Sequence, residues 1–317
     1  RDRLGFARWL VDRRAPLTAR VAVNRVWQTL FGAGLVETPE DFGIRSSPPE
    51  HRELLDWLAV DFMDQCWSHK ELILRIVTSR TYQQDSAGTA ALRERDPANR
   101  LLARGPRFRV DAEIVRDSAL AIAGLLHHQV GGPSVFPPVP ENVLAYNYVR
   151  PTYWQPPEDA QRYRRGLYLF RKRSMPDPML SAFDAPNADF ACARRVRSNT
   201  PLAALTGLNE PIFVEAAQAL ALRLWREGGD SDESRIDLAY RLCTARPPRP
   251  AEQAAVRRLL TESRGRLQRG ELPAAEVAFP VRLKAADLPA DATPAELAAW
   301  TLVARVMLNL DETLTKP

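Results

Sequence analysis

Cysteine and histidine are rare in this chain, and it has no long apolar run. The three cysteines, Cys66, Cys192 and Cys243, are too few and too far apart for a disulfide framework. CWSH at 66–69 lacks the second cysteine of a covalent haem motif, and the four histidines show no spacing typical of zinc. No apolar stretch approaches the length that a membrane-spanning helix needs. The sequence therefore predicts no haem, no metal site and no membrane span in this chain.

Lysine is also scarce, because only four of the 44 basic residues are lysine and the rest are arginine. The formal net charge is +5, and acidic and basic residues are interspersed along most of the chain. No known nucleic-acid-binding motif accompanies the arginines, so no nucleic-acid partner is predicted. Hydrophobic residues make up 45% of the 317 positions and charged residues 26%, which is typical of a globular chain with a substantial core.

The chain divides into two helical regions and an irregular middle. Residues 1–130 and 200–317 carry apolar residues at helical spacing. Residues 131–199 hold ten of the 26 prolines and five of the seven tyrosines, which disfavours long helices there. Within the middle, the alternation in GLYLFRKR at 166–173 predicts a strand. We predict a mainly α, multi-helical single domain over 1–317, with an irregular proline- and aromatic-rich middle and room for a small β-sheet.

Capping residues predict where individual helices begin. Ser68, Thr200 and Thr293 each stand directly before an apolar-periodic stretch, as N-cap residues do. Pro201 occupies the first helical position after Thr200, where a missing backbone N–H costs nothing. By the same reasoning, Asp96 followed by proline is predicted to begin a short helix.

Two acidic residues on one predicted helix are catalytic candidates. Glu113 and Asp117 lie four positions apart and share a face, with Arg116 beside them. A pair of carboxylates can act as acid and base on a glycosidic bond, but an ion-paired helix face has the same spacing. Arg116 is accordingly a candidate either for binding or for a structural ion pair.

The aromatic residues of the middle segment suggest a binding surface. Tyr153 and Trp154 lie among further tyrosines that are interleaved with arginines. Such side chains can stack on sugar rings while arginines hold anionic groups, although they can equally pack against the helical body. Tyr153 and Trp154 are therefore binding candidates, with a polysaccharide as the ligand class.

The stretch FDAPNADFACARRVRSNTPLAAL combines an acid, a cysteine and arginines before a predicted helix start. Asp184, the third catalytic candidate, is expected to pair with an arginine such as Arg194 or Arg195. Cys192 has no accompanying histidine base, which favours an inert thiol. The arginines before the helix form either an anion site or a lock between the middle segment and the helical body, and we favour the lock.

Seven ordered blocks resemble one known family. They are PLTARVAVNRVWQTLFGAGLVETPEDFG, HRELLDWLAVDF, TSRTYQQDS, RVDAEIVRDSAL, FDAPNADFACARR, SNTPLAALTGLNEPIFVEAA and LVARVMLNLDE. Together they resemble the planctomycete-specific domain of unknown function that follows cytochrome c-like domains. Asn24, Arg25 and Asp41, which lie in the first block, are further binding candidates. A functional site would be favoured if these three lie in one cleft with Glu113, Arg116, Asp184 and Arg195. A scaffold would be favoured if each charge is paired locally.

The resemblance implies a setting but no reaction. It implies the C-terminal module of an exported protein, extracytoplasmic in the periplasm or at the cell surface. Its partners would be an upstream cytochrome c-like domain, which carries haem c, and another uncharacterised domain. The start at Arg1, without methionine, fits that expectation. Three functions remain open, namely a binding or scaffold module, an enzyme domain, and a structural cell-surface assembly protein. Residues 265–292 match none of the blocks.

Overall fold

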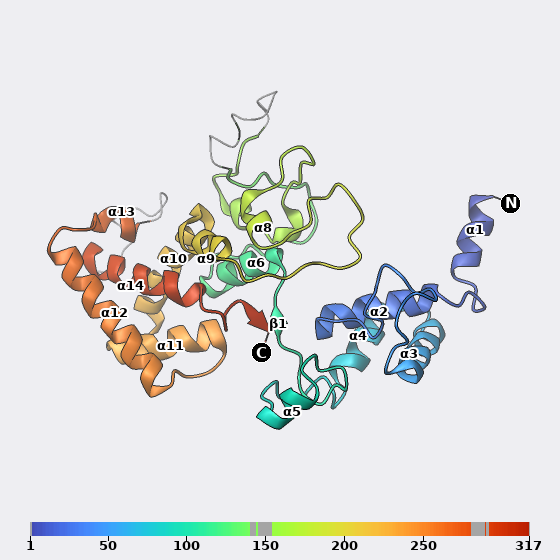
Figure 1. The fold of residues 1–317 in the computed structure, drawn as a ribbon. Helices are drawn as coiled ribbons and strands as arrows, with labels where there is room; N and C mark the ends of the chain where they lie inside the picture. The colour runs from blue at the N-terminus through green and yellow to red at the C-terminus, as the bar shows by residue number, and fades with distance from the viewer. Residues whose placement is uncertain (1, 140–143, 145–153, 280–288, 290–291, 317) are drawn as a thin grey trace. The chain divides into compact units, whose positions relative to one another are not determined.

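The computed structural model of the protein describes residues 2–139, 144, 154–279, 289 and 292–316 (Figure 1). It is 52% helical, with 13 helices and one small two-stranded sheet in the described part, which confirms the mainly α prediction. The chain forms two compact units, unit 1 with residues 1–108 and 316–317, and unit 2 with residues 109–315. Each unit is described by itself.

Unit 1 is built from helices around one apolar cluster. Its helices are α1 (Arg3–Leu10), α2 (Thr18–Phe31), α3 (Arg52–Asp64), α4 (His69–Val77) and α5 (Ala90–Arg95). Helices α2, α3 and α4 contact one another, and their apolar faces meet at Val23, Trp27 and Phe62. Trp27 and Phe31 stack with ring centroids 4.1 Å apart. These one-sided helices are stable because each buries its apolar stripe against the others.

Unit 2 is organised around its last helix. Its helices are α6 (Ala112–Ile122), α8 (Pro178–Ala182), α9 (Pro201–Asn209), α10 (Pro211–Glu227), α11 (Asp232–Thr244), α12 (Pro250–Gln268), α13 (Ala274–Ala278) and α14 (Pro294–Leu308). Helix α14 packs against α9 to α13, and its Trp300 is fully buried. A helix that is apolar on nearly all sides is expected at the centre of a helical domain. Residues 265–292, which match none of the seven sequence blocks, include the end of α12 and all of α13.

The middle segment is irregular, as predicted, but the predicted strand at 166–173 is wrong. Residues 160–163 and 166–168 form the short 3₁₀ helices η1 (Ala160–Tyr163) and η2 (Gly166–Tyr168). Leu169 makes only an isolated bridge to Val135. The small sheet lies elsewhere, between β1 (Phe108–Arg109) and β2 (Thr315–Lys316).

Most of the predicted caps are confirmed. The side chains of Ser68, Thr200 and Thr293 each accept a hydrogen bond from the backbone N–H three residues further on. Asp96 is a different case, because it ends α5 instead of beginning a helix. Its two carboxylate oxygens accept from the backbone N–H groups of Arg100 and Leu101 at 2.8 and 2.9 Å, and so they fold a loop.

Candidate functional site

A groove of about 670 Å³ lies within unit 1. Its aromatic lining consists of Trp27 and Phe31 from the end of α2, together with Phe108. Helix α2 ends at Gly32 in the left-handed conformation, with φ at 83°. A side chain at Gly32 would meet the Phe108 ring at 2.6 Å, so glycine is required for this ring to lie where it does. We call this hollow the unit 1 groove.

Asn24 positions the wall of the groove that follows α2. It is fully buried, its Nδ2 donates to the Val36 carbonyl at 3.1 Å, and its Oδ1 accepts from the Val36 N–H at 2.9 Å. These bonds close the turn that carries Ala33, Gly34 and Leu35 along the groove. Gly34 is also required, because a Cβ there would lie 2.6 Å from the Asn24 amide nitrogen. Asn24 therefore supports the groove without lining it.

The opposite wall is the loop that Asp96 folds. Asn99 and Leu102 in this loop have φ values of 54°, which is uncommon outside glycine. The Asn99 amide donates to the Arg104 carbonyl at 2.9 Å, and Gln84 donates to the Leu102 carbonyl at 3.0 Å. Side-chain hydrogen bonds thus hold an irregular backbone in one conformation beside the groove.

Two polar atoms of this wall are buried without a hydrogen-bond partner. They are the Oδ1 of Asn99 and the Nη1 of Arg104. Native proteins pair nearly all buried polar atoms, so an orphaned acceptor and an orphaned donor along one groove call for a missing partner. Both atoms are shielded from solvent, so a hydroxyl group or a water molecule has to enter the wall beside them to serve either one as donor or acceptor.

The other candidates from the first sequence block lie at the surface of unit 1. Arg25 is exposed on α2. The Asp41 carboxylate accepts from the Gly43 N–H at 2.7 Å and lies 3.6 Å from the guanidinium of Arg45. Neither residue lines the unit 1 groove.

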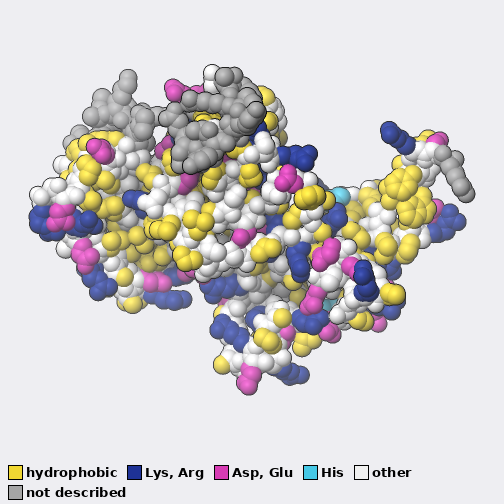
Figure 2. Space-filling view, turned by 45° about the horizontal axis from the view of Figure 1, so that its top comes forward, with side chains coloured by type: hydrophobic (Ala, Val, Ile, Leu, Met, Phe, Trp, Pro, Cys, Tyr) yellow, Lys and Arg dark blue, Asp and Glu magenta, His cyan; other side chains and the backbone are white. Residues whose placement is uncertain are grey.

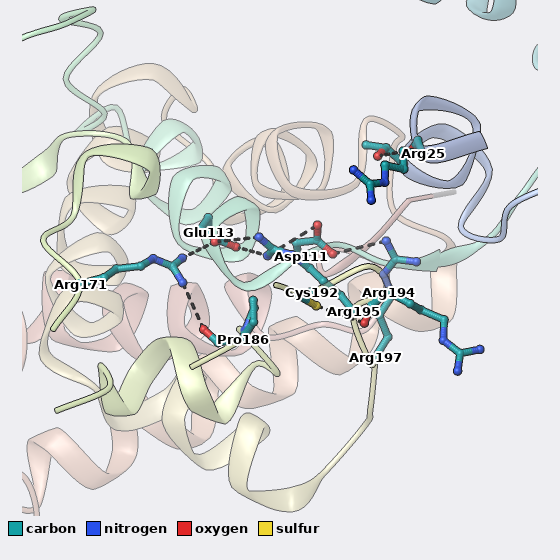
Figure 3. Close-up of polar contacts among 10 residues, drawn as sticks. Arg25, Asp111, Glu113, Arg171, Pro186, Cys192, Arg194, Arg195 and Arg197 are labelled. Carbon is teal, nitrogen blue, oxygen red and sulfur yellow. Dashed lines mark hydrogen bonds and ion pairs between the residues drawn. The ribbon is translucent and has the colours of Figure 1, made fainter. Parts of the chain in front are cut away.

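In unit 2, arginines hold the carboxylates at the start of α6 (Figure 3). Arg195 donates to both oxygens of Glu113, at 2.6 and 3.2 Å, and Arg171 donates to the same carboxylate. Arg197 donates to Asp111 at 3.3 Å. Burial alone would raise the pKa of Glu113, but the hydrogen bonds from Arg195 hold it below its usual value. We call this set of contacts the α6 lock.

The α6 lock leaves almost no room for a ligand. The cavity that Asp111, Asp184 and Arg195 line has a volume of about 10 Å³, which is the space of one water molecule. The expected pairing of Asp184 with an arginine is wrong, because its carboxylate accepts from the N–H and the hydroxyl of Ser198, each at 2.7 Å. The arginines before α9 therefore hold the middle segment against α6, as favoured from the sequence.

Arg194 and Cys192 lie outside these contacts. Arg194 is exposed, and its side chain points away from the Glu113 and Asp111 carboxylates in Figure 3. Cys192 is exposed, with its Sγ 3.2 Å from the Arg194 carbonyl oxygen. No histidine accompanies it within the described contacts.

Arg116 is the most buried of the sequence candidates in unit 2, at 1% exposure. Its guanidinium donates to the backbone carbonyls of Arg164 and Arg162. Asp117, the neighbouring candidate, accepts from the Gly166 N–H at 2.6 Å, and burial raises its pKa. Both residues thus fasten the irregular middle segment to α6.

Trp154 and the aromatic residues that contact it in the middle segment pack inside unit 2, whereas Phe190 is 85% exposed. Trp154 is 8% exposed, donates to the Pro137 carbonyl at 3.0 Å and contacts Phe136 and Phe170. The guanidinium carbon of Arg164 lies over the Tyr168 ring, 3.8 Å from the centre of that ring. Tyr153 lies outside the described residues. The indole ring of Trp154 therefore contributes to packing instead of presenting a face for stacking.

A second hollow, in unit 2, brings together two acids that the sequence did not single out. Asp177 and Glu210 line a mainly apolar pocket of about 410 Å³. Each caps a helix, with Asp177 accepting from Leu180 N–H at 3.1 Å and Glu210 from Ile212 N–H at 2.8 Å. Burial raises the pKa of Asp177, and it raises that of Glu210 to about 7. Their sequence signal, an acid before proline, predicts a cap but not a shared pocket.

The described residues hold no cluster of three or more His, Cys, Asp or Glu side chains that could bind a metal ion. Among these residues, no helix combines the length and the apolar character that crossing a membrane requires.

In the space-filling view of Figure 2, acidic and basic side chains lie intermixed on the visible surface. Charge of one sign therefore does not cover a whole face in this view.

The chain belongs to a protein family of unknown function, whose model matches residues 2–260. The family is PSD1 (DUF1553). The matched range includes the groove, the α6 lock and the acidic pocket, and it runs across both compact units. Neither a curated protein nor a solved structure matches the chain significantly.

Proposed function

We propose that the chain is a binding module whose ligand site is the unit 1 groove and whose ligand is a polysaccharide. The groove volume of about 670 Å³ falls in the range of roughly 300–1,000 Å³ that is typical of ligand sites. Its lining combines aromatic rings with a few polar groups held in fixed positions. Of these rings, Phe108 is partly exposed and suits the apolar face of a sugar, and the polar groups suit its hydroxyls.

The observation that carries this proposal is the pair of orphaned polar atoms in the groove wall. Asn99 Oδ1 needs a donor and Arg104 Nη1 needs an acceptor. A chain rich in hydroxyl groups supplies both along its length. The rigid loop around them means that little ordering is needed when the ligand binds, which favours affinity.

We further propose that this module acts outside the cytoplasm, as part of an exported protein of planctomycete type that carries haem c on a separate cytochrome c-like domain. The resemblance of the seven sequence blocks supports this setting. In such a protein the groove would hold a glycan near a redox domain, and the α6 lock would keep unit 2 rigid as a scaffold.

Blocking the groove tests the proposal. Ala33 lines the groove and is exposed, so Ala33→Trp fills the space without disturbing a buried position. The full chain is screened on an array of oligosaccharides, and each hit is measured by calorimetry. The variant is expected to lose binding. Ala7→Trp, at an exposed position of α1 away from the groove, is the matched control and is expected to bind normally. Binding that survives Ala33→Trp would contradict the proposal.

A second candidate function is acid–base hydrolysis of a glycosidic bond at the acidic pocket of unit 2. The observation that favours it is the pair of carboxyl groups with raised pKa values in one pocket. Glu210, with a pKa of about 7, holds its proton long enough to act as a general acid near neutral pH. Glu113, by contrast, has a lowered pKa and both oxygens held by arginine, which is unfavourable for proton donation.

Product release from oligosaccharides separates the two candidates. If hydrolysis occurs at the pocket, Glu210→Gln should abolish it, whereas Ala33→Trp should weaken binding only. Release of products by both wild type and Glu210→Gln would exclude this pocket as the catalytic centre.

A further inference from the structure

The unit 1 groove carries more positive than negative charge. Its charged lining residues are Arg93, Arg100, Arg104, Arg107, Glu37 and Glu50. Arg100 forms ion pairs with both acids. Its Nε lies 3.1 Å from Glu37 Oε1, and its Nη2 lies 3.8 Å from Glu50 Oε1. Four arginines against two glutamates give this lining a formal net charge of +2.

Two of the remaining arginines have donors to spare. Arg93 is exposed and makes no ion pair or side-chain hydrogen bond with any residue that the structure describes. Arg104 donates to the Pro97 carbonyl at 2.9 Å, while its Nη1 has no acceptor. Asp96 acts on Arg104 electrostatically, but its oxygens already accept backbone N–H groups. A guanidinium with unused donors is a site for an anion with paired oxygens.

We infer that the groove selects a glycan that carries anionic groups, carboxylate or sulfate, over a neutral one. The inference rests on the proposed function and names its substrate class. The partly exposed ring of Phe108 would contact the sugar rings, which both kinds of glycan have. Arg93 and Arg104 would contact the charged groups, which only one kind has. Specificity then comes from the arginines, and general affinity comes from the rest of the groove.

Three oligosaccharides of equal length provide the test, one neutral, one built of uronates and one bearing sulfate esters. Their affinities for the full chain are measured by calorimetry at low and high salt. At least one anionic oligosaccharide is expected to bind roughly tenfold or more tightly than the neutral one at low salt, and high salt should reduce this advantage. The tighter of the two anionic chains identifies the favoured group.

Variants assign the selectivity to the groove. Arg93→Gln changes an exposed residue, so it should fold normally, weaken anionic binding about tenfold and leave neutral binding unchanged. Arg104→Gln should weaken the binding of both kinds of chain, and that of the anionic chain more, because the proposed site also uses its Nη1 for sugar hydroxyls. Arg80→Gln, at an exposed position of unit 1 outside the groove, is the matched control and should change neither.

The outcomes separate the two proposals. Equal affinity for neutral and anionic chains, or full anionic selectivity in both arginine variants, overturns the inference and leaves the binding module intact. Failure of every oligosaccharide to bind overturns the proposed function, and the inference falls with it.

Discussion

Arg195 and Glu113, which are 82 positions apart in the chain, form a two-point contact in which each terminal nitrogen of the guanidinium meets its own carboxylate oxygen. The contact joins the loop before α9 to the first turn of α6. Paired hydrogen bonds between charged groups fix orientation as well as distance. This relationship makes Arg195 a structural residue, and it predicts how the protein responds when the contact is broken.

Arg195→Ala should lower the stability of unit 2 by about 1–3 kcal/mol at neutral pH, because Glu113 loses a charged partner at a partly buried site. The lowered pKa of Glu113 means that the contact stabilises the fold above the unfolded pKa of about 4.5. The stabilisation is lost as pH falls below that value. Urea denaturation of wild type and variant at neutral and acidic pH measures the effect. Arg258→Ala, at an exposed position of α12, is the control, and an equal loss in both variants would contradict the prediction.

Gly34→Ala should destabilise unit 1, because the new methyl group would lie 2.6 Å from both the Asn24 amide and the Val36 carbonyl oxygen. A loss of about 1–3 kcal/mol is expected from overpacking. Gly265→Ala provides the contrast, since this glycine lies inside α12 and its nearest neighbour is the flexible end of Arg269 at 3.2 Å. That variant should gain about 0.5–1 kcal/mol from helix propensity. Thermal denaturation of both variants measures whether each is more or less stable than wild type. Destabilisation of both variants, or of neither, would contradict the prediction.

Asn24→Ala tests the same turn from the other side. It leaves the N–H and the carbonyl of Val36 without partners in a buried position, at a cost of about 2–4 kcal/mol. Because the turn forms one wall of the unit 1 groove, ligand binding should weaken together with stability. Asn24→Asp separates the two bonds, since it keeps the acceptor for the Val36 N–H and removes the donor. A stability equal to that of wild type in both variants would show that the amide does not hold the turn.

Glu210 should make the protein less stable as pH rises from about 4.5 to 7. The folded chain keeps the proton up to a pKa of about 7, whereas an unfolded glutamic acid loses it near 4.5. In that window the unfolded state releases its proton first, so the free energy of unfolding falls by as much as about 3 kcal/mol. Glu210→Gln keeps an oxygen for the Ile212 N–H but cannot ionise, so it should remove this fall.

The measurement for Glu210 is a series of denaturation midpoints across that pH window. Above pH 7 the glutamine variant should be more stable than wild type, and the difference should shrink toward pH 4.5. Glu262→Gln, an exposed change on α12, is the control and should follow the wild-type curve. If the stability of wild type rose with pH in this window, and that of Glu210→Gln rose in the same way, the pH dependence could not be assigned to Glu210.

The helix starts could be predicted because their chemistry is local. Ser68, Thr200 and Thr293 bond to the backbone three residues away, and this bond depends on little beyond the neighbouring sequence. Asp96 has the same local appearance, but its carboxylate reaches forward to Arg100 and Leu101 and stabilises a loop. The competing loop conformation could not be distinguished from a cap by residue type alone.

The strand predicted at 166–173 failed for a different reason. Alternating apolar residues form a strand only when a neighbouring strand pairs with them, and Leu169 finds a single bridge to Val135. Arg116 instead donates to the carbonyls of Arg162 and Arg164, just before this stretch, and Arg164 donates to the carbonyl of Pro133. Tertiary contacts of this kind, made over long sequence separations, override the local pattern.

The candidate site was harder to predict than the fold. The lock before α9 was expected, but its acidic partners proved to be Glu113 and Asp111 instead of Asp184. The sequence did not bring the arginines of the unit 1 groove together with Trp27, because no spacing between Arg93 and Arg104 marks them as neighbours of that helix end. A loop that folds back on a helix end creates such a groove, and its course depends on contacts that no short motif encodes.

The buried arginines have a consequence for how order in the middle segment would be observed. Arg116 and Arg164 supply donors to backbone carbonyls there, in the way that the N–H groups of a neighbouring strand would. A guanidinium cannot accept a hydrogen bond, so the backbone N–H groups of Arg162 and Arg164 donate elsewhere, to the carbonyls of Asp159 and Gln161. Amide hydrogen exchange should therefore be slow at these two residues, although no α-helix or β-strand contains either of them. Limited proteolysis, which requires the backbone itself to open, should find the same segment resistant.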